Sequence, residues 1–200
     1  MANPARFRDV ADISSHYAAD TPVMLVLSAP QGVTNDLVAL VSAAQQGGDW
    51  QAALDSLQAR FEALIIDADP ALPEYERHAL LQAARDQVQV LADYAKGIAL
   101  LQHCPDPVQA RMLGTGEQFS VALMTASLKA RGLDAGALDA TRLVKSQGDY
   151  LNASADIPST IAAFTERKTQ GLPRISVMAG FVYGLPHGET ALLGRNGSDY

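Results

Sequence analysis

Two short apolar runs, far apart in the sequence, place the strongest constraint on the fold of this 200-residue chain. Residues 23–28 read Val-Met-Leu-Val-Leu-Ser, and residues 174–179 read Arg-Ile-Ser-Val-Met-Ala. A continuous apolar run of strand length is typical of a strand covered on both faces, as in the parallel sheets of α/β proteins. We therefore expect an α/β fold in which both runs are buried strands of one sheet.

Helical periodicity accounts for most of the sequence between these runs. Helices are predicted over residues 3–19, 34–46, 49–66, 74–102, 105–129 and 159–168. The second of them is expected to begin with N-cap chemistry from Thr34, Asn35 and Asp36. Residues 133–158 are less regular, residues 180–188 form a Gly/Pro-rich turn, and residues 190–193 are a short return strand.

The segment 49–104 is predicted to be an inserted helical hairpin, because Pro70 and Pro73 separate two long amphipathic stretches. Asp67 and Asp69 flank this turn and are expected to be solvated. One compact domain is the expected organisation for a chain of this length.

Composition excludes several classes of function. The chain has 15 basic and 22 acidic residues, a net charge of -7, and no basic stripe, which excludes nucleic acid or an anionic membrane as the main partner. The single Cys104 excludes an internal disulfide framework and fits a reducing compartment. No run approaches the ~18 apolar residues of a membrane span, and no signal peptide is apparent. We expect a cytoplasmic protein.

Metal and common nucleotide motifs are not found in the sequence. The histidines lack metal-ligand spacing, so no metal site is predicted; they are His16, His78, His103 and His187. Gly114-x-Gly116 is not a dinucleotide fingerprint, because Phe119 stands where the third glycine belongs. The sequence also lacks a Gly-x4-Gly-Lys-Ser/Thr phosphate loop and a Gly-x-Ser-x-Gly nucleophile elbow.

Three loops share a glycine-rich pattern next to a predicted helix: residues 28–34, 114–117 and 194–199. Glycines let backbone N–H groups approach a ligand, and a helix N-terminus carries partial positive charge. Each loop taken alone is also an ordinary turn. Taken together they predict a site for a small anionic or zwitterionic molecule.

Side chains in the three loops fit the two ends of an amino acid. Arg195 provides a planar fork suited to a carboxylate, and Glu117 can receive an ammonium. Neutral donors are provided by Ser28, Thr34 and Ser198. The same residues also fit a purely structural interpretation, in which Glu117 lies on a solvated helix face and Arg195 forms a structural ion pair.

In this order and spacing, three segments resemble the aspartate kinases of the amino-acid kinase superfamily. Residues 26–35 resemble the family's Ser-Ala-x4-Thr-Asn segment, and residues 116–120 resemble its Gly-Glu-x-x-Ser. Gly180-Phe181, followed by residues 193–200, resembles Gly-Phe…Leu-Gly-Arg-x-Gly-Ser-Asp. The Arg-Asn-Gly-Ser-Asp-Tyr ending and the run at 103–106 are most similar to bifunctional aspartokinase/homoserine dehydrogenases.

The resemblance implies a three-layer α/β/α sandwich around a largely parallel sheet. It also implies a kinase that transfers the γ-phosphoryl of Mg-ATP to the side-chain carboxylate of L-aspartate, giving 4-phospho-L-aspartate for amino-acid biosynthesis. The parent enzyme is expected to be a homo-oligomer.

Residue roles follow from the matching motifs. Arg195 is expected to bind the α-carboxylate of aspartate and Glu117 its α-ammonium. The other expected substrate-binding residues are Thr34, Phe181 and Ser198. The expected catalytic residues are Ser28 and Asp199, and the expected nucleotide contacts are Gly194 and Gly197.

The sequence departs from the family pattern at both ends. The family opens with a strand ending in Lys-Phe-Gly-Gly-Thr-Ser, whereas Met1-Ala2-Asn3 begins where that loop would finish. We expect residues 1–200 to be the N-terminal, substrate-binding part of the kinase domain, without the nucleotide-binding half and regulatory domains, and inactive alone. The alternatives are a non-catalytic amino-acid-binding or assembly module and a related kinase acting on glutamate or acetylglutamate.

Overall fold

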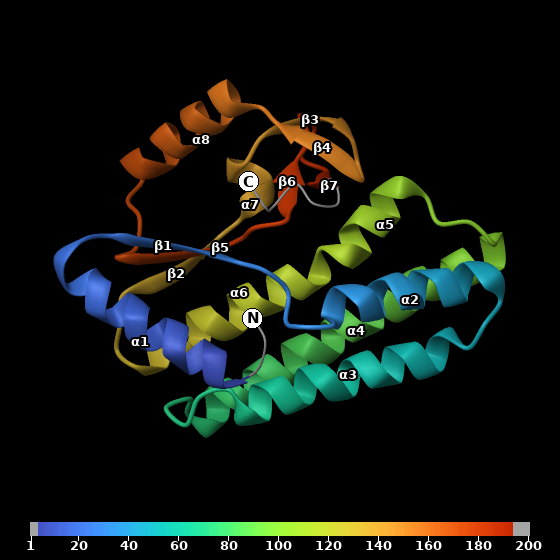
Figure 1. Ribbon diagram of the computed structural model, residues 1–200, viewed down its shortest axis with the longest axis horizontal. Coiled ribbons are helices and arrows are strands. Elements are labelled where there is room, and N and C mark those ends of the chain that lie inside the picture. The colour runs from blue at the N-terminus through green and yellow to red at the C-terminus, as the bar shows by residue number, and fades with distance from the viewer. Residues whose placement is uncertain (1–3, 194–200) are drawn as a thin grey trace.

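A parallel three-stranded sheet lies at the centre of the computed structural model, which describes residues 4–193 (Figure 1). Its strands are β1 (Val23–Leu27), β5 (Ile175–Ala179) and β2 (Ala135–Leu138), in the order β1-β5-β2. Both neighbours pair with β5 in parallel, starting from Ile175. The predicted α/β fold class is confirmed.

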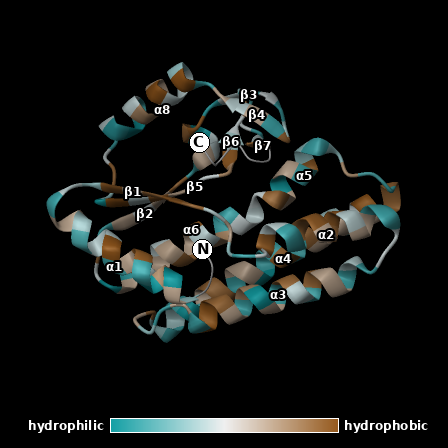
Figure 2. Ribbon diagram, in the orientation of Figure 1, coloured by the Kyte–Doolittle hydropathy of each residue, from teal (hydrophilic) through white to brown (hydrophobic). Residues whose placement is uncertain are grey.

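The two apolar runs differ in how they are covered. Every residue of β5 is buried, as predicted. The prediction that both faces of β1 are covered is wrong, because Met24 is 42% exposed and Val26 is 57% exposed. β1 lies at the edge of the sheet, and helix packing covers only one of its faces. β1 and β5 are coloured as hydrophobic along much of their length in Figure 2.

Helices lie on both sides of the sheet (Figure 1). α1 (Pro4–Asp20) and α6 (Thr115–Ala130) pack against one side, and α8 (Ile157–Thr169) lies on the other. α5 (Asp106–Leu113) precedes α6, and only Gly114 separates the two, with right-handed helical angles. The glycine-rich loop predicted at 114–117 is therefore a single-residue junction between two helices.

A further helical layer packs on α6. It contains α2 (Val33–Gln46) and the hairpin of α3 (Trp50–Asp67) and α4 (Glu74–Leu101). Asp49 caps α3 by accepting a hydrogen bond from the backbone N–H of Ala52 at 3.0 Å. No helix in the described part of the chain is long and apolar enough to cross a membrane.

The irregular region predicted at 133–158 contains regular elements. Besides β2 it forms α7 (Ala140–Leu143) and an antiparallel hairpin of β3 (Ser146–Asp149) and β4 (Asn152–Ala155). The turn predicted at 180–188 likewise includes β6 (Val182–Gly184), which pairs with β7 (Thr190–Leu192). β6 packs so closely on α7 that a Cβ atom at Gly184 would lie 1.7 Å from the carbonyl oxygen of Thr141.

An ion-pair network joins α1, the α3–α4 turn and the end of α6. The Arg131 guanidinium donates to Asp69 at 2.8 Å and also to Asp12. Asp69 is 3% exposed and accepts a second hydrogen bond, from the N–H of Ala71. The expectation that Asp69 is solvated is therefore wrong, because the turn packs against Arg131.

Candidate functional site

The candidate site lies where β1 and β5 end side by side. The backbone N–H of Gly180 donates to the carbonyl of Leu27 at 3.0 Å. A Cβ atom at Gly180 would lie 2.9 Å from Val26 Cγ1, a distance that real Cβ atoms essentially never show. Glycine thus allows the two strand ends to meet, and Ser28 and Phe181 follow them. This is the carboxyl edge of the sheet, where α/β proteins bind ligands.

The N-terminus of α6 packs directly on the loop that follows β1. A Cβ atom at Gly116 would lie 2.7 Å from Ala29 Cβ and 2.9 Å from Val33 Cγ1. Only a residue without a side chain allows this approach. The next residue of α6, Glu117, is brought against the same loop.

The carboxyl group of Glu117 is buried and only partly satisfied. The side chain is 3% exposed, and Oε1 accepts a hydrogen bond from the N–H of Ala29 at 3.4 Å. Oε2 is buried and has no hydrogen-bond partner within residues 4–193. Burial raises the pKa of this carboxyl group, and hydrogen bonds from backbone N–H groups offset part of that increase. The structure excludes the interpretation of Glu117 as a solvated surface residue.

A buried carboxylate oxygen without a donor costs free energy unless a ligand provides one. An ammonium group is suited to this place, since it carries both donors and the opposite charge. A buried carboxyl with a raised pKa at the edge of a sheet is also typical of functional sites.

The first loop holds two further predicted site residues. Ser28 is exposed, and Thr34 is half-buried in the first turn of α2. The prediction that residues 34–36 cap this helix is wrong. The N-cap residue of α2 is Gly32, which has a φ of 85° and makes no capping hydrogen bond through a side chain.

A positive charge that the sequence analysis did not identify lies beside this loop. Arg60 of α3 places its Nε 2.8 Å from Asp36 Oδ2, and its guanidinium lies within 4 Å of the Cβ position at Gly32. No sequence motif signals this position, because it depends on how α3 packs against α2.

Five predicted site residues lie outside the described residues: Gly194, Arg195, Gly197, Ser198 and Asp199. The last described residue, Leu193, donates its backbone N–H to the carbonyl of Phe181 at 3.1 Å. Phe181 is half-buried beside the end of β5. The described residues thus bring Ser28, Glu117 and Phe181 to one edge.

Other groups with potential chemistry do not form a site. Within residues 4–193, no three His, Cys, Asp or Glu side chains are grouped so that they could hold a metal ion. Cys104 is buried, and burial together with the nearby Asp106 carboxylate raises the pKa of its thiol. A buried thiol of this kind is a poor nucleophile.

Comparison with known proteins decides the family. The sequence profile described as "Amino acid kinase family" matches residues 1–200. The chain belongs to the amino acid kinase family. The resemblance to aspartate kinases is confirmed by relatives that carry this name. One is the bifunctional aspartokinase/homoserine dehydrogenase of Haemophilus influenzae, 29% identical over all of this chain and 24% of that protein. Another is lysine-sensitive aspartokinase 3 of Escherichia coli, 30% identical over 88% of this chain and 38% of that protein.

Solved structures of the family have the same fold. Escherichia coli aspartokinase III, crystallised with aspartate and ADP, superposes with a TM-score of 0.76 over 96% of this chain and 42% of that one, at 23% identity. At this identity the likeness shows the fold of the family. The chain spans about a quarter of the bifunctional relative's length.

Proposed function

We propose that this chain is the aspartate-binding part of an aspartate kinase, which transfers the γ-phosphoryl group of ATP to the side-chain carboxylate of L-aspartate. The observation that carries the proposal is the buried Glu117 carboxylate with one oxygen lacking a donor, at the carboxyl edge shared by β1 and β5. Aspartokinase relatives of this family favour aspartate as the occupant. The product is 4-phospho-L-aspartate.

In this proposal Glu117 binds the α-ammonium of aspartate and Arg195 binds its α-carboxylate. The substrate is also lined by Thr34, Phe181 and Ser198. Ser28 and Asp199 orient the reacting groups, and Gly194 and Gly197 contact the nucleotide, which is bound with Mg²⁺. Phosphoryl transfer needs chiefly alignment and neutralisation of charge, so no protein nucleophile is required. We further propose that the parent enzyme is cytoplasmic and homo-oligomeric, and that a separate half of its kinase domain binds the nucleotide.

Calorimetric titration with two matched ligands tests the role of Glu117. Succinate has the two carboxylates of L-aspartate but lacks the ammonium. Glu117→Gln should weaken L-aspartate binding about tenfold to a hundredfold, since a hydrogen bond to a charged group contributes roughly 1.5–3 kcal/mol and 1.4 kcal/mol is tenfold. Succinate affinity should not fall. Glu166→Gln, on the exposed surface of α8, is the control and should change neither.

Three results would reject the proposal. They are no binding of L-aspartate to the unaltered protein, an equal loss for L-aspartate and succinate in Glu117→Gln, and binding of L-glutamate as tight as that of L-aspartate. The last result would move the assignment to a related amino-acid kinase.

A further inference from the structure

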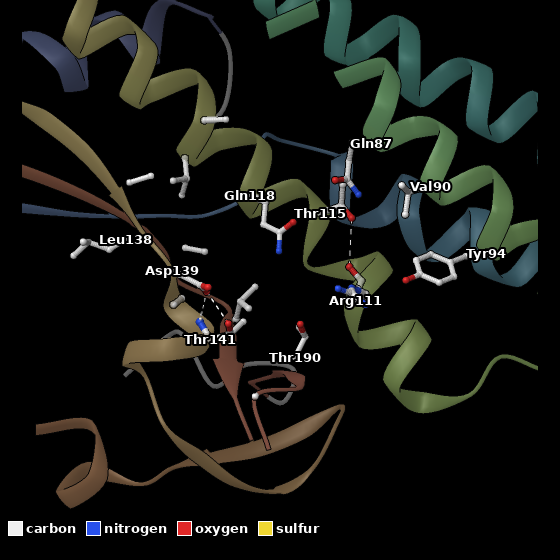
Figure 3. A pocket seen from close by; sticks show the side chains of 17 residues that line it. Gln87, Val90, Tyr94, Arg111, Thr115, Gln118, Leu138, Asp139, Thr141 and Thr190 are labelled. Carbon is white, nitrogen blue, oxygen red and sulfur yellow. Dashed lines mark hydrogen bonds between the residues drawn. The ribbon is translucent and has the colours of Figure 1, made fainter. Parts of the chain in front are cut away.

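A cavity that Glu117 does not line lies beside α6, at the carboxyl ends of β2 and β5 (Figure 3). Its volume is about 770 Å³, within the range of about 300–1,000 Å³ typical of small-molecule sites. Polar side chains from three helices line it: Gln87 and Tyr94 of α4, Arg111 of α5, and Thr115 and Gln118 of α6. The aspartate proposal uses none of them.

An apolar slot of about 230 Å³ adjoins this cavity. The two hollows share the lining residues Gln87, Thr115, Gln118 and Ala122. From there the slot runs between α4 and α6 to apolar side chains, namely Phe61, Ile65, Leu80, Phe119 and Leu123. The cavity and the slot together are called the α4–α6 groove.

The sequences of α4, α5 and α6 make the groove polar at one end and apolar at the other. Arg111, Thr115, Gln118 and Ala122 are spaced by four, three and four residues, so they follow one helical face. α4 runs antiparallel to them, which sets its polar residue Tyr94 near Arg111 and its apolar residue Leu80 at the far end. At that end the rings of Phe61 and Phe119 are stacked, with centroids 4.2 Å apart.

The polar end of the groove carries the exposed positive charge of Arg111. The Arg111 side chain makes no hydrogen bond or ion pair with any residue from 4 to 193. On the opposite wall, the carboxylate of Asp139 is already engaged. It accepts hydrogen bonds from the N–H and hydroxyl of Thr141 at 2.9 and 2.6 Å, and Arg142 Nε lies 3.4 Å from it. The groove therefore favours an anion.

We propose that the α4–α6 groove binds a small amphipathic carboxylate. Its carboxylate pairs with the Arg111 guanidinium, a fork that matches carboxylate geometry. Its apolar tail enters the slot toward Phe119. A purely polar anion would leave the slot empty, and an apolar molecule would leave Arg111 unpaired. One water takes about 30 Å³ in the liquid, so a slot of about 230 Å³ holds a tail of roughly seven heavy atoms.

Calorimetry with octanoate, acetate and octylamine tests this proposal on the purified protein. Octanoate has both the head and the tail, acetate has only the head, and octylamine has the tail with the opposite charge. Octanoate should bind, and the other two should bind at least tenfold more weakly. In NMR spectra, the terminal methyl of bound octanoate should show contacts to the Phe119 ring.

Two variants separate the head from the tail. Arg111→Gln should weaken octanoate about tenfold, the loss expected for a hydrogen bond to a charged group. Ala122 is exposed and lines both hollows, so Ala122→Phe should block the slot and abolish octanoate binding while the melting temperature stays unchanged. Lys129→Ala, an exposed charge in the last turn of α6, is the matched control and should bind octanoate normally.

The proposal is overturned by any of four results: no octanoate binding, acetate or octylamine binding as tight as octanoate, unchanged affinity in Arg111→Gln, or methyl contacts to a different part of the protein. None of these measurements depends on aspartate binding, so failure of the aspartate proposal leaves the test intact.

Discussion

Replacing Glu117 by glutamine is expected to stabilise the ligand-free protein at neutral pH. The carboxyl group is 3% exposed, and one of its oxygens has no donor among the described residues. A buried polar group without a partner costs about 1–3 kcal/mol, and more when it is charged. Glutamine retains the shape and the acceptor for the Ala29 N–H but carries no charge. We expect a gain of about 1–2 kcal/mol, or roughly 2–8 °C in melting temperature for a chain of this length.

The gain should depend on pH, with a sign that follows from the raised pKa of Glu117. Between the ordinary value of 4.5 and the raised value, the folded protein binds a proton that the unfolded chain has released. Stability contributed by this group is therefore full below pH 4.5 and is lost as the pH rises through the folded pKa. Glutamine does not titrate, so the advantage of Glu117→Gln should be largest at neutral pH and smallest in acid.

Urea denaturation and thermal melting, each with and without L-aspartate, measure both effects. Ligand at about a hundred times its dissociation constant adds about 2.7 kcal/mol to a protein that binds it. The unaltered protein should gain this, whereas a variant that binds tenfold to a hundredfold more weakly should gain only about 0.4–1.4 kcal/mol, so the ligand should narrow the difference between the two melting temperatures and reverse it if the loss of affinity is near a hundredfold. Equal or lower stability of ligand-free Glu117→Gln at neutral pH would show that the buried oxygen has a donor, and would refute the reasoning.

Two further sets of substitutions test the packing. Gly184→Ala places a Cβ atom 1.7 Å from a backbone oxygen of α7, so it should cost at least about 3 kcal/mol in urea denaturation. Gly97→Ala, in α4 with nothing within 4 Å, should instead stabilise by about 0.5–1 kcal/mol; a similar effect of both substitutions would contradict the proposed clash. Arg131→Met leaves the buried carboxylate of Asp69 without its ion-pair partner and should lower the free energy of unfolding by about 3 kcal/mol. Adding Asp69→Leu should recover most of that loss. A double variant as unstable as the single one would show that Arg131 acts through Asp12 or through packing of its stem.

Local signals were sufficient to predict the long helices and the central strand. The α3–α4 hairpin was predicted from apolar spacing and from the prolines of its turn, both of which act within a few residues. β5 was predicted from a continuous apolar run, and its five residues are all buried. These signals do not depend on the rest of the fold.

Features that depend on distant contacts were not predicted. β2 reads Ala-Gly-Ala-Leu, a short segment without β-branched residues, and it is a strand because it pairs with β5. The exposed face of β1 depends on which helices lie over the sheet. The burial of Asp69 depends on Arg131, which is remote in the sequence.

Part of the candidate site could be predicted, because its residues come from motifs with a fixed order. The motifs identified Ser28, Glu117 and Phe181, and the parallel sheet brings the ends of β1 and β5 together. The burial of Glu117 could not be predicted, since an acidic residue in the first turn of a helix is usually solvated. Its environment depends on close contact between Gly116 and Ala29, which appears only in three dimensions.

α6 forms part of both proposed sites, and its sequence explains how one helix can form walls of both. Glu117 and Gln118 are consecutive, so their side chains point about 100° apart around the helix axis. Glu117 faces the loop after β1, whereas Gln118 faces the α4–α6 groove. Gly116 already lies in contact with Ala29, so α6 has no room to move further toward that loop. The glycine that brings Glu117 to the proposed aspartate site thereby also fixes the wall of the groove, because both are parts of one helix packed on β2 and β5.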